Sequence, residues 1–247
     1  MALLATAASV ALVMFTSTFG WLGVVIEGIA LKSMLSLRGL ARAALAVRDD
    51  LARADLGGAR AAVGRDLVSR PTAGLGPGQV ASAAIESVAE NLTDAFLAPL
   101  LFFVVFGLPG AVFYRVVNTA DAMIGYRDGP LLYFGRVAAR LDDALNLVPA
   151  RVAALFIVAA AIVTGDDSRR ALRAMKRDHG LTASPNAGWT MSAMAGALTV
   201  TLAKPATYTL GAGPVPTPFD ITRAVDLLAV AAALAVPAIV AVALALA

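Results

Sequence analysis

The chain has 247 residues, of which 59% are hydrophobic and 15% are charged, and this composition is too apolar for an ordinary soluble domain. It has no cysteine, which excludes disulfides, thiolate nucleophiles, iron–sulfur clusters and cysteine-type zinc sites. The net charge is only +3 and no basic run is interleaved with aromatic residues, so we expect no nucleic-acid partner.

The N-terminal range 1–31 predicts the first membrane helix. It is apolar apart from Glu27, and it exceeds the roughly 20 residues that span a bilayer. It lacks the basic start of a signal peptide, and its apolar run is longer than a signal peptide needs. We therefore interpret it as a retained transmembrane helix.

The range 32–78 predicts amphipathic helices and a loop on the cytoplasmic face. It is rich in arginine, and basic segments beside membrane helices face the cytoplasm. Within it we expect two amphipathic helices over 39–54 and 56–68, broken at the glycine pair 57–58, and then a loop over 71–78.

The range 79–124 predicts a helical hairpin. Its first helix, over 79–106, has a polar first half and an apolar second half. The sequence Gly-Leu-Pro-Gly at 107–110 breaks this helix, and a second helix over 111–124 returns.

An acidic stripe occupies the first half of that hairpin. Glu86, Glu90 and Asp94 are spaced four residues apart, so they follow one side of a helix, with Asn91 beside them. Like charges at this spacing repel each other, and ionisable groups in a membrane are expensive and usually functional. We therefore expect a metal ion or a cluster of arginine and lysine to face them; a solvated helix face is the alternative.

The returning helix adds an amide and a further carboxylate. Asn118 and Asp121 should come back to the side of Glu90 and Asp94, so that one polar cavity could hold them all. Arg127, which follows this helix, could bind a phosphate or a carboxylate through its planar guanidinium group. Helix capping and a surface ion pair are the alternative.

A second acidic–basic cluster lies in the segment 125–223, on an amphipathic stretch over 130–146. It comprises Arg140, Asp142, Asp143, Asn146 and Arg151. The pattern fits either a functional cluster or a surface helix that carries charge pairs, and the sequence alone does not decide between them.

The rest of this segment and the C-terminal range 224–247 predict further helices. An apolar helix over 148–164 is just long enough for a crossing, and a basic helix follows over 166–179. The sequence Ser-Pro-Asn-Ala-Gly-Trp at 184–189, which contains Asn186 and Trp189, is either a plain turn or a turn that presents backbone N–H groups and an indole to a ligand. The chain continues with a methionine-containing helix over 190–198, an irregular Pro/Gly-rich stretch over 204–218 and the last membrane helix over 226–247.

These elements predict an all-α, polytopic membrane protein of four to five membrane helices that form one integrated domain. We expect it in the cell membrane, with its polar site facing the cytoplasm. The topology has one open point. A single crossing at 148–164 would place the basic range 169–177 outside, so that helix is either re-entrant or an exception to the charge rule.

An ordered set of short motifs over roughly residues 60–215 resembles the CobD/CbiB family, the membrane enzymes called adenosylcobinamide-phosphate synthase. Each motif is weak alone, and their order and spacing together are specific. The motifs are Gly64-Arg65-Asp66, Glu86-Ser87-Val88-Ala89-Glu90-Asn91 with Asp94, Pro109-Gly110-Ala111, Asn118-Thr119 with Asp121, Gly125-Tyr126-Arg127, Ala139-Arg140-Leu141-Asp142-Asp143 with Asn146, Pro149-Ala150-Arg151, Ser184-Pro185-Asn186-Ala187-Gly188-Trp189, and Tyr208 with Leu210-Gly211.

This resemblance implies a ligase of cobalamin biosynthesis. Adenosylcobyric acid would supply a propionate carboxylate, and 1-aminopropan-2-ol, its O-phosphate or an ethanolamine analogue would supply the amine for an ATP-dependent amide bond. The expected partners are therefore a corrinoid and a small amino alcohol, besides the lipid bilayer and other membrane enzymes of corrinoid assembly. ATP and Mg²⁺ are the expected co-substrate and metal, because activating a carboxylate with ATP needs cations on the transferring phosphoryl group.

The same resemblance suggests roles for the polar residues. Metal binding is assigned to Glu86, Glu90, Asp94 and Asp121, and Asn91 and Asn118 complete the candidate catalytic set. Substrate and phosphate binding is assigned to Arg65, Arg127, Arg140, Asp142, Asp143, Asn146, Asn186 and Trp189.

Two other functions stay open beside the ligase. Family members usually carry Gly-Asp-Pro and His-Pro motifs near the first helix, and the range 1–27 has neither. The first alternative is therefore a non-catalytic membrane sensor or assembly relative of the same fold. The second is an ion-coupled transporter that uses the acidic stripe as an ion path.

Overall fold

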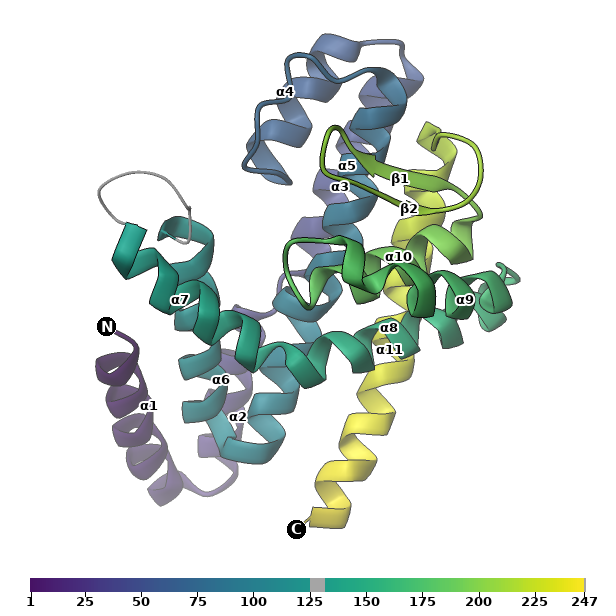
Figure 1. Cartoon of the computed structure of the whole chain (residues 1–247). Helices are drawn as coiled ribbons and strands as arrows, with labels where there is room; N and C mark the ends of the chain where they lie inside the picture. The colour runs from purple at the N-terminus through teal and green to yellow at the C-terminus, as the bar shows by residue number, and fades with distance from the viewer. Residues whose placement is uncertain (125–131, 247) are drawn as a thin grey trace. The chain divides into compact units, whose positions relative to one another are not determined.

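The computed structural model describes residues 1–124 and 132–246 (Figure 1). Helices dominate it, and four stretches are long and apolar enough to cross a membrane: Ala2–Phe19, Pro77–Met123, Leu147–Thr164 and Pro218–Ala245. This confirms the prediction of an all-α polytopic membrane protein.

The chain divides into two compact units. The first unit contains residues 1–36, 94–149 and 237–247, and the second contains 37–93 and 150–236. The expectation of one integrated domain stays a prediction.

The N-terminal range of the first unit is a pair of helices rather than the single helix expected over 1–31. Helix α1, Ala2–Thr16, and the short 3-10 helix Ser17–Phe19 precede α2, Trp21–Met34. Gly20 lies between them at φ +55°, a backbone conformation that glycine adopts without strain.

A hydrogen bond shows the chain reversal at this glycine. The Thr16 hydroxyl donates to a Glu27 carboxylate oxygen at 3.0 Å, whereas eleven residues of straight helix would separate the two positions by about 16 Å. The one charged residue of this apolar range therefore has a polar partner inside the helix pair.

Helix α6, Ala98–Ile124, contains the expected hairpin. Its backbone breaks at Gly107, with φ 66° and ψ −165°, two residues before Pro109. The rings of Phe102 and Tyr114 then stack at 5.2 Å, although twelve residues of straight helix would separate them by about 18 Å. The predicted break and return are confirmed; an additional π-helical segment, Thr93–Leu97, precedes α6.

Helix α7, Leu132–Leu145, packs on α6 in the first unit. It confirms the amphipathic helix expected over 130–146. Its buried face carries polar side chains, because Asp142 and the following Asn146 are both buried. A plain surface helix with charge pairs is therefore the wrong interpretation for these two residues. Helix α8, Leu147–Thr164, follows directly and confirms the third apolar helix.

The second unit opens with the two expected amphipathic helices. They are α3, Leu37–Ala52, and α4, Leu56–Asp66, and the break lies at 53–55 rather than at the glycine pair 57–58. Ala54 takes φ 58° there, and the Asp55 carboxylate accepts a hydrogen bond from Gly58 N at 2.8 Å. Asp55 caps the N-terminus of α4, so the helix begins at Leu56 and the glycine pair 57–58 lies inside its first turn.

Helix α5, Pro77–Leu92, begins two residues earlier than predicted, at a proline in the position where helices tolerate it best. The loop before it, expected over 71–78, is fixed at both ends. Thr72 Oγ1 donates to the Arg60 carbonyl at 2.9 Å, and Arg60 Nε donates to the Leu75 carbonyl at 2.7 Å.

The remaining helices of the second unit are α9, Ser168–Asp178, the 3-10 helix His179–Leu181, and α10, Ala187–Leu198. Helices α9 and α10 touch at Gly196, where an added Cβ would lie 2.4 Å from the Arg170 carbonyl oxygen. Only glycine permits this separation of the two backbones.

The last helix, α11, Pro218–Leu246, starts eight residues before the predicted position. Asp220 explains the early start, because its carboxylate accepts from Thr217 N at 2.9 Å and from Thr217 Oγ1 at 2.8 Å. Such a bond satisfies a backbone donor at the helix start.

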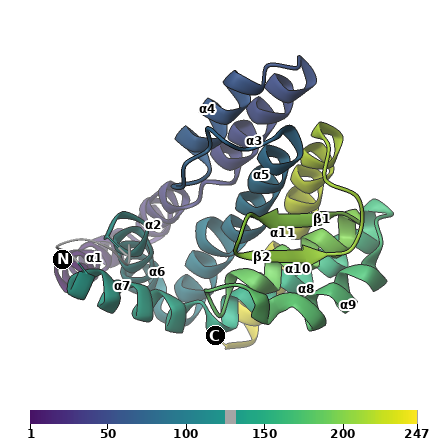
Figure 2. The ribbon, with the colours of Figure 1, turned by 45° about the horizontal axis from the view of Figure 1, so that its top comes forward.

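A β-hairpin stands where an irregular stretch was expected over 204–218. Strand β1, Thr201–Lys204, pairs antiparallel with β2, Tyr208–Gly211, and Leu202 lies opposite Leu210. Figure 2 shows the hairpin lying over α10. The two leucines are fully buried, and as cross-strand partners they project to the same face of the hairpin. The strands are only four residues long and lie beside Pro/Gly-rich sequence, so the sequence did not indicate them.

Candidate functional site

A polar pocket of about 190 Å³ lies in the second unit, between α5, the loop before it, α10 and the β-hairpin. It contains two of the predicted acidic residues, Glu86 and Glu90. The residues that line it are Leu67, Val68, Ser69, Arg70, Ala83, Glu86, Ser87, Glu90, Met191, Lys204 and Tyr208.

Glu86 is the most constrained of these side chains. It is 5% exposed, and its Oε2 accepts from the Tyr208 hydroxyl at 2.9 Å and from Arg70 Nη2 at 3.2 Å. Its Oε1 accepts from Ser82 Oγ at 2.8 Å. Ser82 Oγ in turn accepts from Ala203 N at 2.8 Å, which ties α5 to β1. A buried carboxylate is tolerated only when it is paired and hydrogen-bonded, and Glu86 meets both conditions.

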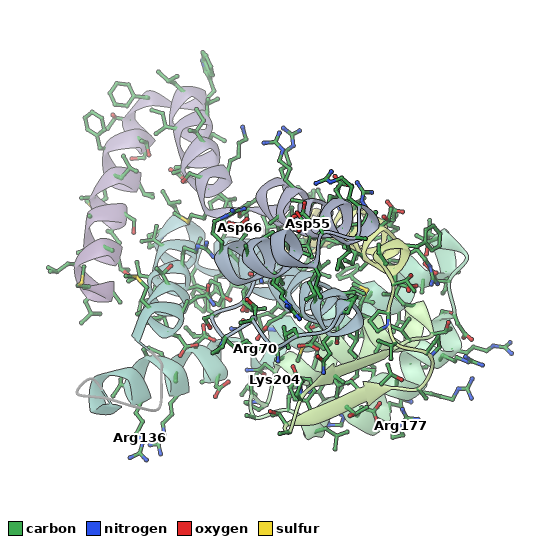
Figure 3. The ribbon with its side chains drawn as sticks, turned by 90° about the horizontal axis from the view of Figure 1, so that it is seen from above. Asp55, Asp66, Arg70, Arg136, Arg177 and Lys204 are labelled. Carbon is green, nitrogen blue, oxygen red and sulfur yellow. The ribbon has the colours of Figure 1, made fainter. Side chains whose placement is uncertain are left out.

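Two cationic side chains, Arg70 and Lys204, line the pocket beside the acidic stripe. Arg70 comes from the loop between α4 and α5, and Lys204 ends strand β1 (Figure 3). The expectation that cations face the acidic stripe is fulfilled for Glu86 by Arg70, which belongs to none of the sequence motifs.

Tyr208 is a fixed hydrogen-bond donor in this pocket. Burial raises the pKa of its phenol above the usual value, and the neighbouring Glu86 carboxylate raises the same pKa further. The hydroxyl therefore stays protonated and keeps donating to Glu86.

Ser87 and Asn91 stabilise the frame of the pocket. Ser87 Oγ donates to the Leu67 carbonyl at 3.0 Å, which attaches the loop to α5. Asn91 Nδ2 donates to the carbonyl and to the hydroxyl of Ser87, at 3.0 and 3.2 Å. Asn91 is not among the lining residues, so in this structure it contributes through Ser87.

A second polar cluster lies in the first unit, between the two arms of α6 and α7. The fully buried Tyr114 hydroxyl donates to Asn146 Oδ1 at 2.9 Å and lies 3.4 Å from a carboxylate oxygen of Asp94. Asp142 accepts from Asn118 Nδ2 at 3.1 Å and from Asn146 Nδ2 at 3.0 Å. The predicted meeting of Asn118 with Asp94 is therefore realised through these bridging side chains.

The pKa of the Asp142 carboxyl is raised above its usual value. Desolvation raises the pKa of its carboxyl, and the negative charge of Asp143 adds to this, while the hydrogen bonds from Asn118 and Asn146 act in the opposite direction. Asp121 lies within electrostatic reach of the same two carboxylates. Arg115 Nη1, on the same helix as Asn118, donates to the Asp94 carbonyl at 3.4 Å and to Asn118 Oδ1 at 3.3 Å.

The predicted phosphate-binding arginines occupy different positions. Arg65 is exposed and forms an ion pair with Asp66 at 2.7 Å, away from the pocket lining. Arg140 is exposed on α7. Arg127 lies outside the described residues. Their roles in substrate binding stay predictions.

The segment around Asn186 and Trp189 forms a compact cluster at the start of α10. Arg151 Nη1 donates to Asn186 Oδ1 at 3.0 Å, and its guanidinium lies 4.7 Å from the centre of the Trp189 ring. The centre of the His179 ring lies 4.1 Å from that of the same indole. Ser184 Oγ accepts from Asn186 N at 3.2 Å, so the turn uses this backbone donor itself. These contacts favour a structural turn.

The four residues that were predicted to bind a metal ion are divided between the two units. Glu86 and Glu90 belong to the second unit, and Asp94 and Asp121 belong to the first. Over 1–124 and 132–246, no group of three or more His, Asp or Glu side chains is close enough to hold a metal ion by itself. A shared cavity and the metal role of these four residues stay predictions.

Comparison with known proteins identifies the family. The family model described as "CobD/Cbib protein" matches residues 1–236. The chain belongs to the CobD/CbiB family.

Curated relatives agree with this family assignment. "Cobalamin biosynthesis protein CobD" of Dehalococcoides mccartyi is 47% identical over 76% of this chain and 60% of its own length. "Probable cobalamin biosynthesis protein CobD" of Methanothermobacter thermautotrophicus is 46% identical over 77% of this chain and 63% of its own length. The Rhodobacter capsulatus protein named "Cobalamin biosynthesis protein CobD" is 42% identical over 84% of this chain and 68% of its own length.

The chain therefore spans about 60% of the length of the first two of these relatives. No solved structure matches it.

Two pocket residues of this CobD/CbiB chain, Arg70 and Lys204, lie outside the motifs, and Tyr208 lies in a motif but had no role assigned to it. Arg70 is one of many arginines in a basic segment, and Lys204 and Tyr208 lie in the stretch 204–218 that was expected to be irregular. Each strand of the hairpin has one buried residue, Leu202 or Leu210, and the strand register places Lys204 opposite Tyr208.

Proposed function

We propose that this protein acts in cobalamin biosynthesis, where it joins an amino alcohol or its phosphate to a propionate carboxylate of a corrinoid in an ATP-dependent amide ligation. One observation carries the proposal: the pocket beside α5 combines a carboxylate, Glu90, with the two cationic side chains of Arg70 and Lys204. Family membership and the names of the relatives support the pathway, and the proposed substrates are those that the family resemblance implies.

The chemistry of a ligase requires this combination of charges. Forming an amide from a carboxylate needs activation by ATP, and the transferring phosphoryl group needs cations around it. Arg70 and Lys204 would bind phosphate oxygens, and Glu90 would hold Mg²⁺. Since Mg²⁺ is usually bound by one or two carboxylates together with phosphates and water, a single protein carboxylate is compatible with it. The metal, when bound, would neutralise phosphate charge.

Glu86 has a different task in this proposal. Its oxygens already accept hydrogen bonds from Tyr208, Ser82 and Arg70, so it orients the guanidinium and the phenol. The site is proposed to face the cytoplasm, where ATP is present.

A ligation assay tests the proposal directly. Purified protein in detergent would be mixed with adenosylcobyric acid, Mg-ATP and aminopropanol phosphate, or ethanolamine phosphate in a parallel reaction, and products would be identified by mass. We expect a condensed corrinoid that depends on ATP. Folded protein that yields no product with either amine would contradict the ligase and favour the non-catalytic relative.

Glu90→Gln links the activity to the pocket. The substitution keeps the shape and removes the charge that would hold Mg²⁺, so we expect ligation to fall roughly hundredfold. Asp49→Asn is the matched control, because Asp49 pairs with Arg48 outside the pocket and its substitution should leave ligation unchanged. Wild-type turnover in the Glu90 variant would exclude the metal role.

A further inference from the structure

One guanidinium nitrogen in the pocket is left without a partner. Arg70 Nη2 contacts Glu86 at 3.2 Å, whereas Nη1 is buried and, within the described parts of the chain, donates no hydrogen bond. A buried N–H group that makes no hydrogen bond loses its solvation without compensation. A hydrogen-bond acceptor on a ligand would satisfy this N–H group, and a charged acceptor forms the strongest such bond.

The ammonium of Lys204 lines the same pocket. In the described structure its side chain forms no ion pair and no hydrogen bond. Lys204 lies directly opposite Tyr208 in the hairpin register, and cross-strand partners project to the same face of a sheet. The hairpin thus brings a positive charge and the Glu86-bound phenol to one wall of the pocket.

The frame behind these groups fixes Arg70 in place. Glu86 holds Nη2, and Tyr208 and Ser82 hold Glu86. The loop that carries Arg70 is attached to α5 through the Ser87–Leu67 hydrogen bond. The unpaired Nη1 is therefore held in one orientation before a ligand binds, so binding costs less conformational entropy.

From this geometry we infer an oxyanion site in which Arg70 Nη1 and the Lys204 ammonium bind the oxygens of a phosphate group, with Glu86 as the residue that positions Arg70. The naming of a phosphate rests on the proposed ATP-dependent function. A carboxylate offers the same oxyanion chemistry, so the substrate's propionate is the second source, and the experiment separates the two. A pocket of about 190 Å³ is several times the volume of a water molecule and accommodates a phosphate group.

Binding of pyrophosphate, measured by calorimetry on the purified full chain in detergent, tests this site without requiring ligation. EDTA would be present, so that a metal ion bound through Glu90 does not contribute. Acetate and propionate would be titrated in separate runs. We expect pyrophosphate to bind, and to bind far more tightly than either monocarboxylate.

Two variants remove the proposed donors. Lys204→Gln removes the ammonium at a partly exposed position. Arg70→Gln alone would leave Glu86 buried without its cation, so the double variant Arg70→Gln/Glu86→Gln is preferred, because it keeps the charge balance. Each should weaken pyrophosphate binding roughly tenfold to hundredfold. Lys176→Gln, which removes an exposed charge on α9, is the matched control and should bind like the wild type.

Each outcome decides the proposal. Unchanged pyrophosphate affinity in folded Lys204→Gln and in the folded double variant would overturn the oxyanion site. Equal affinity for propionate and pyrophosphate would assign the site to the carboxylate and overturn the phosphate. Pyrophosphate binding that depends on both donors, in a protein that fails the ligation assay, would support the site while refuting the ligase.

Discussion

The contact between Glu86 and Arg70 should be energetically coupled, and a double-mutant cycle can measure the coupling. The two side chains are 7% and 19% exposed, so solvent screens their interaction only weakly. Removing one partner of such a pair typically costs about 3–5 kcal/mol, because the other charge stays buried. We expect Glu86→Gln and Arg70→Gln each to lose about 3 kcal/mol of unfolding free energy.

The double variant should lose less than the sum of the two. With both charges gone, neither desolvated ion remains, so the interaction term should be about 2 kcal/mol. The amide oxygen that Glu86→Gln introduces can accept from one of the two hydroxyl donors, Tyr208 or Ser82. Ser82 Oγ still accepts from Ala203 N, which keeps α5 and β1 together.

Tryptophan fluorescence during denaturation in detergent would report this energy. Trp189 belongs to the second unit and Trp21 to the first, so a Trp21→Phe background confines the signal to the unit that contains the pair. Additive losses, within about 0.5 kcal/mol, would refute the argument that Glu86 and Arg70 depend on each other.

Two further predictions concern the packing and the pH dependence of the second unit. Gly196→Ala should destabilise this unit by about 1–3 kcal/mol, because its Cβ would lie 2.4 Å from the Arg170 carbonyl oxygen; a melting temperature in detergent equal to that of the wild type would contradict the close contact. Burial acts to raise the pKa of Asp178, but hydrogen bonds from Arg177 and from Gly211 N hold this pKa below its usual value. The stability that Asp178 contributes is therefore fully present above the usual aspartate pKa of 3.8, which applies to the unfolded chain, and is lost as the pH falls through the lower pKa of the folded state. The unfolding free energies of wild type and Asp178→Asn should accordingly differ more at pH 6 than at pH 3, and an equal difference at both values would refute the linkage.

The positions of helices were predictable from the sequence where a continuous apolar run was long. The break at Gly107 and the helices over 111–124 and 148–164 were expected because the sequence Gly-Leu-Pro-Gly at 107–110 and the length of the apolar runs are local signals. The reversal at Gly20 was missed, since one glycine in an apolar run does not by itself indicate a turn. The early start of α11 depended on the Asp220 cap, which lies just after the Pro/Gly-rich stretch 204–218.

The candidate site was predictable only on its acidic side. Glu86 and Glu90 were identifiable because carboxylates spaced along an apolar helix are conspicuous. Their cationic partner Arg70 comes from a loop, and Lys204 comes from a hairpin about 120 residues further along the chain. The sequence pattern of α5 does not indicate its cationic partners, because only tertiary packing brings the loop and the hairpin next to this helix.

The packing of the second unit has a consequence for the path of the chain through the bilayer. Helix α9 packs on α10, α10 on α5, and α5 on α3, so the arginine-rich segments of α3 and α9 belong to one compact body. Placing them in opposite compartments would require charged helices to extend through lipid, at a cost of several kcal/mol per charge. A re-entrant α8 would instead leave both segments in one compartment. The chain contains no cysteine, so single cysteines introduced at Arg48 and Arg173 would show by thiol labelling from one side of sealed vesicles whether both positions react together.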